Sequence, residues 1–145
     1  MIASSDLGVI TEKLILLRQY LGELSEIKDI TFNYYMGNKI VKRGAERLLQ
    51  LLVEVASDIN GALLTMGDKT PPESYYESFI KAGKAGLIPD QLAKRLAPSS
   101  GLRNRIVHEY GEYKDSIVYK NIKSIHKNYS DYLRSINNYL QKKKI

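Results

Sequence analysis

The 145-residue sequence contains no cysteine, which excludes disulfides and thiolate metal sites and agrees with a reducing compartment. It also has no long uninterrupted apolar run, because the most apolar stretch, residues 48–56, contains Gln50 and Glu54. We therefore expect no membrane-spanning segment. Residues 1–6 lack the basic and apolar regions of a signal peptide, so we expect a cytoplasmic protein.

With 43% hydrophobic and 26% charged residues, the chain has the composition of a soluble globular protein. Its length predicts a single domain, residues 1–145, with a hydrophobic core. The net charge of +6 comes entirely from residues 120–145, where seven Lys or Arg face one acidic residue. Such a basic strip favours a polyanion such as RNA. A solvated helix face with a frayed lysine tail explains the same charge, and charge alone favours this second interpretation.

Apolar residues recur at helical spacing over most of the chain, and no segment alternates as a strand would. One apolar stripe runs from residue 10 to 24, a longer one from 41 to 63, and a third from 118 to 140. These stripes predict three long amphipathic helices. Between the first two, residues 30–37 are aromatic and irregular, and we expect a break at the glycine that ends them.

Shorter helices are predicted between the second and third stripes. Residues 70–73, Thr-Pro-Pro-Glu, resemble a capping box with proline at the first helical position, and predict a helix from there to about Ala85. Pro89 opens a short helix that Pro98 ends. Ser99 or the following serine can then cap another helix.

We expect that last short helix to run to Gly111. Together these elements predict an all-α fold, an up-and-down helical bundle. The stripes keep a near-heptad spacing, and a small bundle has spare apolar faces, so we also expect a homodimer.

Residues 101–110 read GLRNRIVHEY and carry most of the chemistry of the chain. Arg103 offers a permanent charge and a planar fork that suits phosphate oxygens. Histidine is the side chain that most often moves protons in catalysis, and this stretch contains His108. Asn104 and Tyr110 add an amide and a phenol. We find no metal-binding spacing and no phosphate-binding glycine loop around them, so we expect neither metal nor cofactor.

On an ideal helix, with Arg103 at zero, Asn104 falls at ~100°, His108 at ~140° and Tyr110 at ~−20°. Arg103 and Tyr110 would then share one face, and Asn104 and His108 another. Arg103 and His108 do not converge on one small substrate by themselves. The arginine could reach round, the helix could be distorted, or a symmetry-related chain could complete the site.

This inventory fits metal-free cleavage of RNA, in which a base activates a ribose 2′-OH, arginine stabilises the phosphorane and an acid protonates the leaving oxygen. Taken alone, an Arg-His pair on a helix is more often part of a surface salt bridge, or an arginine beside a core histidine, than a catalytic pair. We interpret His126, among Lys123 and Lys127, as exposed, and Glu46 as a surface charge. The eleven tyrosines are interpreted as packing and interface residues.

The order Arg103, four residues, His108, one residue, Tyr110 resembles the signature of the HEPN superfamily in its HepT-like toxin branch. The flanking residues, the long helix over 39–61 and the segment 75–89 follow the same order, so the resemblance covers nearly the whole chain. Gly111 departs from it, because a bulky aromatic residue is frequent there in the commonest branch.

The resemblance implies a metal-independent endoribonuclease, the toxin of a type VII toxin–antitoxin pair, with its site in a cleft between two protomers. Arg103 and His108 would be catalytic, and Asn104 would orient groups or contact substrate. The implied partner is a minimal nucleotidyltransferase antitoxin, which would transfer AMP to Tyr110. The added charge and bulk would block RNA.

Two other hypotheses stay open at this point. The same fold could bind a nucleotide or a nucleotidyltransferase partner without cleaving RNA. Alternatively, the partner could be the toxin and this chain the antidote.

Overall fold

The computed structural model describes residues 4–143, which form seven helices and no strand. Residues 1–3, at the start of the segment examined for a signal peptide, and residues 144–145, at the end of the basic strip, lie outside this range. The all-α bundle predicted from the sequence is confirmed.

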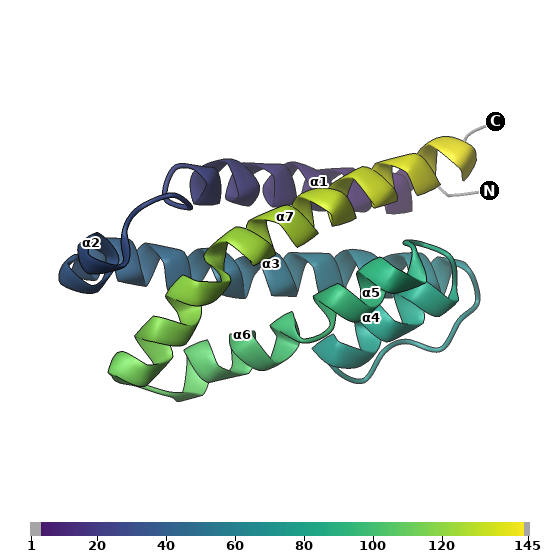
Figure 1. Cartoon of the computed structure of the whole chain (residues 1–145). Coiled ribbons are helices and arrows are strands. Elements are labelled where there is room, and N and C mark those ends of the chain that lie inside the picture. Colours follow the sequence, from purple (N-terminus) through teal and green to yellow (C-terminus); the bar gives the residue numbers. More distant parts are fainter. Residues whose placement is uncertain (1–3, 144–145) are drawn as a thin grey trace.

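Three long helices form the core: α1 (Ser4–Ser25), α3 (Lys39–Met66) and α7 (Glu112–Lys143). Helix α1 packs along α3, and α7 crosses both (Figure 1). The apolar stripes predicted for these helices face inward, and Leu17, Leu52 and Ile136 at their centres are fully buried. Burial of these stripes, rather than helix propensity, holds the helices together.

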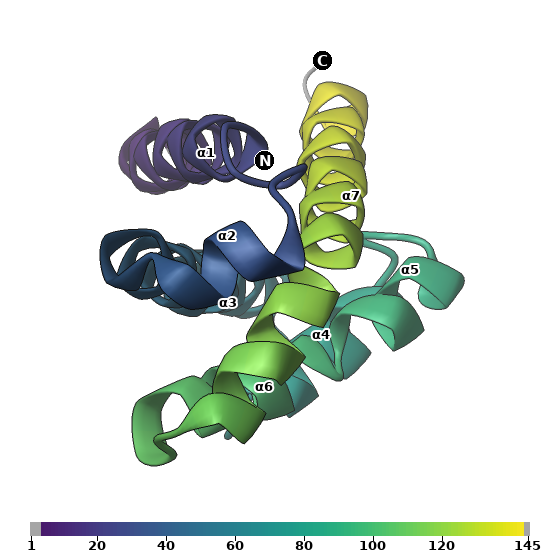
Figure 2. The same cartoon turned by 60° about the vertical axis from the view of Figure 1, so that its left-hand side comes forward.

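Three short helices follow α3 in the sequence: α4 (Tyr75–Lys84), α5 (Asp90–Leu96) and α6 (Ser99–His108). Helices α4 and α6 pack on α3, whereas α5 packs on α4 and α7 (Figure 2). Helices α4 and α5 pack closely because residue 83 is glycine: a Cβ there would lie 2.6 Å from the Cβ of Ala93. This layer holds α6 against the middle of α3.

The structure corrects three local predictions. Residues 32–37 are not irregular but form a short helix, α2 (Phe32–Gly37), because Thr31 caps it through a 3.1 Å bond from the backbone N–H of Tyr34. Helix α4 begins at Tyr75 rather than at residue 71, because Ser74 caps it. The Ser99 and Ser100 hydroxyls do not cap α6 but donate to carbonyls three residues earlier.

Glu46, predicted to be a surface charge, is 7% exposed and lies under the start of α7. Its carboxylate is 3.0 Å from the ammonium of Lys114, which is 4% exposed. Beside it, Lys42 pairs with Asp115 at 3.3 Å. These pairs fix the first turn of α7 to α3, and removing one member would leave a buried charge without its partner.

Helix α3 is the one helix in residues 4–143 that is long and apolar enough to cross a membrane by length and composition, although we expected no such run. Helix α3 is also central in the bundle, and 56% of its most apolar stretch is buried against its neighbours. Core helices of soluble proteins have the same length and composition. The expected homodimer stays a prediction.

Candidate functional site

The sequence-predicted site lies on α6 and the turn that follows it. Helix α6 ends at His108, because Glu109 is extended, with φ −116° and ψ 157°. The chain then turns through Gly111, whose φ of 105° suits glycine, and enters α7. Helix α6 is therefore three residues shorter than the sequence predicted, because it ends at His108 rather than at Gly111. Tyr110 lies outside it.

Arg103 points at α3 and makes the most contacts of the predicted site residues. Its Nε and Nη2 both donate to Oε2 of Glu54, at 3.1 and 2.9 Å. Its guanidinium carbon lies 4.8 Å from the centre of the Tyr75 ring, on α4. The third nitrogen, Nη1, donates to Oδ1 of Asn104 at 3.3 Å. Three helices therefore hold one guanidinium.

Glu54 is fixed in turn by Gln50, whose amide donates to Glu54 Oε2 at 3.0 Å. The Arg103 and Glu54 side chains are 18% and 28% exposed, so water still reaches the pair. The sequence reading identified neither Glu54 nor Tyr75 as site residues. No motif in the sequence marks either residue, because α3 and α4 bring them to Arg103 only when the helices pack.

Asn104 and His108 lie on the outer side of α6, and both are exposed. Asn104 borders a cavity of about 350 Å³ between α3, α4 and α6. The second histidine of the sequence, His126, lies on α7 beside α1 residues. Arg103 is half-buried against Glu54, whereas His108 is exposed at the end of α6. Convergence of the two side chains on one substrate stays a prediction for a two-chain site.

Tyr110 does not share a helical face with Arg103, so that prediction is wrong: the helix ends two residues before it. The phenol is 89% exposed, more than any other large hydrophobic side chain described. Exposure on a turn makes its hydroxyl accessible to another protein.

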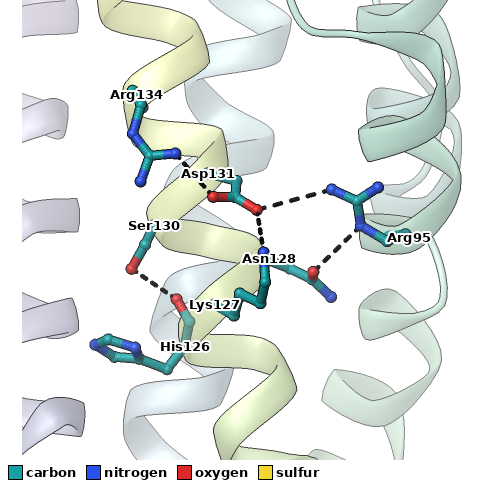
Figure 3. Close-up of polar contacts among 7 residues, drawn as sticks. All are labelled: Arg95, His126, Lys127, Asn128, Ser130, Asp131 and Arg134. Carbon is teal, nitrogen blue, oxygen red and sulfur yellow. Dashed lines mark hydrogen bonds and ion pairs between the residues drawn. The ribbon is translucent and has the colours of Figure 1, made fainter.

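His126, the second histidine, lies on the side of α7 that faces α1. The sequence predicted it to be exposed, but it is half-buried. Burial lowers its pKa, and nearby Lys28 lowers it further. Its ring points away from Asp131 (Figure 3).

The basic strip of α7 is partly neutralised within the chain. Asp131 lies 3.0 Å from Lys127, 2.9 Å from Arg134 and 3.7 Å from Arg95 of α5 (Figure 3). These ion pairs tie α5 to α7, and the strip keeps its net charge of +6 because Asp131 is its one acidic residue. Within residues 4–143 no group of three or more His, Cys, Asp or Glu side chains is placed to hold a metal ion.

A family model described as Ribonuclease HepT-like matches residues 17–136. The chain belongs to this family. A relative named tRNA nuclease HepT, from Aphanizomenon flos-aquae (strain 2012/KM1/D3), is 37% identical over 132 residues, which are 91% of this chain and 90% of that protein. The HepT-like resemblance read from residues 101–110 is thereby confirmed.

Solved structures share the fold. The tri-AMPylated HEPN toxin of Shewanella oneidensis, in complex with MNT antitoxin, aligns with a TM-score of 0.79 and 20% identity over 90% of this chain and 97% of that chain. The cytosolic protein YutE of Bacillus subtilis, whose function is unknown, aligns with a TM-score of 0.79 and 18% identity over 96% and 93% of the two chains. At these identities the likeness shows the HEPN-type fold.

Proposed function

We propose that this HepT-like chain is a metal-independent endoribonuclease and the toxin of a toxin–antitoxin pair. The observation that carries the proposal is the anchored Arg103. Three helices hold its guanidinium, yet Glu54 occupies only its Nε–Nη2 edge, through one carboxylate oxygen. Nη1 donates one N–H to the Asn104 amide oxygen, which leaves a second N–H on each of Nη1 and Nη2 for the oxygens of a phosphate.

The proposed reaction needs no cofactor. A base takes the proton of a ribose 2′-OH, and the oxygen attacks the adjacent phosphorus while Arg103 stabilises the phosphorane charge. The bond from phosphorus to the 5′-oxygen breaks, and an acid protonates that oxygen. The products are a 2′,3′-cyclic phosphate and a 5′-OH. Asn104, bonded to Arg103, orients the guanidinium or contacts the substrate.

The reaction uses two proton-transfer groups, and each chain has one histidine in the motif. We propose that a homodimer supplies both, with the His108 of each protomer facing a shared cleft. The outward position of His108 supports this arrangement, as does the exposed Val107 beside it.

For the partner we propose a minimal nucleotidyltransferase antitoxin that attaches AMP to Tyr110. Support comes from the 89% exposure of Tyr110 and from the Shewanella oneidensis toxin, which is tri-AMPylated and bound to MNT antitoxin. The name of the Aphanizomenon flos-aquae relative makes tRNA the first substrate to test. A cytoplasmic location follows from this substrate, and YutE is described as cytosolic.

The test is cleavage of tRNA and other RNAs by the purified chain in EDTA, with mapping of the RNA ends. Wild type should leave 2′,3′-cyclic phosphates, and Arg103→Ala and His108→Ala should each abolish cleavage and growth inhibition. Cleavage retained by His108→Ala would overturn the mechanism. Absence of cleavage across varied RNAs, with tight binding of the nucleotidyltransferase, would instead support a non-catalytic binding module. Expressing each gene alone decides which of the two is toxic.

A further inference from the structure

The cavity beside Arg103 has a wall of unusual composition. It combines two aromatic rings, Tyr75 and Tyr76, with the Glu73 carboxylate, the Asn104 amide and three serines. Its volume of about 350 Å³ lies at the lower end of the range of small-molecule sites. It is open to solvent on one side, so a single flat group could enter without a change of fold.

This cavity adjoins the phosphate-binding edge of the site. Tyr75 both lines the cavity and carries the Arg103 guanidinium on its ring, 4.8 Å from the ring centre. Asn104 also lines the cavity and accepts a bond from Arg103 Nη1. A phosphate held by Arg103 therefore places its own nucleoside near the cavity mouth.

The charge of the wall selects against a phosphate. No lysine or arginine lines the cavity, and its one charged residue is Glu73. A dianion or a phosphodiester would meet a like charge there without a compensating cation. Tyrosine rings and hydrogen-bonding side chains are instead the groups that bind unstacked bases of single-stranded RNA.

We propose that this cavity binds one unstacked RNA base next to the phosphate held by Arg103, and that it prefers bases with an exocyclic amino group. The proposal rests on the proposed ribonuclease function. Tyr76, which is 55% exposed, stacks on the base, and the Glu73 carboxylate accepts a hydrogen bond from the amino group.

The preference for an amino group follows from Glu73. An ionised carboxylate only accepts hydrogen bonds, and within residues 4–143 that of Glu73 has no hydrogen-bond or ion-pair partner; only its backbone N–H is bonded, to Glu77. Cytosine presents an N4 amino donor where uracil presents a carbonyl oxygen. A cytosine therefore satisfies the carboxylate, whereas a uracil places an acceptor against an acceptor.

The experiment measures binding separately from cleavage. Fluorescence anisotropy with the full His108→Ala chain compares two single-stranded RNAs of equal length, all-cytidine and all-uridine. The cytidine RNA should bind about fivefold or more tightly, by the usual size of a base-discriminating contact. Tyr76→Ala should weaken the binding of both RNAs by about tenfold, the usual effect of losing one stacked base. Glu73→Gln should remove the difference, because an amide both donates and accepts.

Matched controls are available on other surfaces. Tyr34→Ala removes a tyrosine that is 54% exposed on α2, and Glu26→Gln removes an exposed carboxylate after α1. Both should leave the two affinities unchanged. In the His108→Ala chain, equal binding with and without Tyr76→Ala, or a cytidine preference that survives Glu73→Gln, would overturn the base pocket even if wild type cleaves RNA. Tyr76-dependent binding without any cleavage by wild type would instead refute only the ribonuclease function.

Discussion

Arg103 and Glu54 lie 49 residues apart in the sequence but are joined by two hydrogen bonds. One carboxylate oxygen of Glu54, Oε2, accepts from Arg103 Nε at 3.1 Å and from Arg103 Nη2 at 2.9 Å. The pair joins α6 to α3, so the rigid central helix fixes the direction of the guanidinium. A residue that fixes another in this way is a positioning residue. Its removal should alter turnover more than substrate binding, because a misplaced arginine still attracts phosphate but no longer meets the transition state.

We expect Glu54→Ala to lower kcat by about a hundredfold, the usual cost of a misplacement of about 1 Å, with KM changed by less than about threefold. Glu54→Gln should recover part of the loss, because its amide oxygen can accept from the same two nitrogens. Initial rates over a range of RNA concentrations give both constants. An increase in cleavage by Glu54→Ala would mean that Glu54 masks the charge of Arg103 instead of positioning it.

The composite site has its own test in mixed dimers. Unfolding and refolding His108→Ala chains together with wild type gives mixed dimers that hold one His108 instead of two. Because the proposed reaction uses both histidines, an equal mixture should keep about a quarter of the cleavage of the same amount of wild type, since about a quarter of its dimers are wild type on both sides. A mixture that keeps about half would place each site within a single chain, because half of its chains are wild type.

The long helices were predictable because their apolar stripes repeat over many turns, and burial of Ile10, Leu49 and Ile122 follows that repeat. The end of α6 was not, because nothing in the local sequence marks Glu109 as extended. The sequence predicted that α6 runs to Gly111, which placed Tyr110 on the same helical face as Arg103. Tyr110 instead lies beyond the end of the helix. The positive φ of Gly111 shows that this glycine serves the turn after the helix.

The site was predictable only for residues adjacent in sequence. Arg103, Asn104 and His108 form one motif, but the neighbours that orient Arg103 come from α3 and α4. Such long-range contacts depend on how helices pack, which apolar periodicity does not specify. The burial of Glu46 was missed for the same reason, since its partner Lys114 lies on another helix.

Two buried tyrosines predict opposite effects on stability. Tyr132 Oη lies 2.6 Å from Asn60 Oδ1 and 3.0 Å from the Ala56 carbonyl oxygen, whereas the Tyr35 hydroxyl has no hydrogen-bond partner in residues 4–143. Tyr132→Phe should lower the free energy of unfolding by about 1–3 kcal/mol, because Asn60 loses a buried partner. Tyr35→Phe should leave it unchanged or raise it. Urea unfolding of both variants measures this, and equal losses would contradict the hydrogen-bond assignment.

His126 predicts a pH dependence of stability. Burial and Lys28 lower its pKa below the ordinary 6.5, although Asp29 and a Leu21 backbone contact oppose the shift. The unfolded chain then binds the proton more readily, so this contribution is present above pH 6.5 and is lost as pH falls through the folded pKa. Between pH 7 and 5, wild type should lose more unfolding free energy than His126→Asn. Parallel curves for the two proteins would show that His126 does not contribute.

Tyr110 and Tyr113 provide a matched pair for the proposed control by AMP transfer. Both residues are exposed, at 89% and 70%, but Tyr110 ends the motif on the turn after α6, whereas Tyr113 lies in the first turn of α7. Tyr110→Phe removes only the acceptor oxygen, so it should keep ribonuclease activity and resist neutralisation by the nucleotidyltransferase with ATP. Tyr113→Phe should be neutralised like wild type. Intact mass spectrometry should find added AMP on wild type and Tyr113→Phe but not on Tyr110→Phe. AMP on the Tyr110→Phe chain together with lost toxicity would place the controlling modification on another residue.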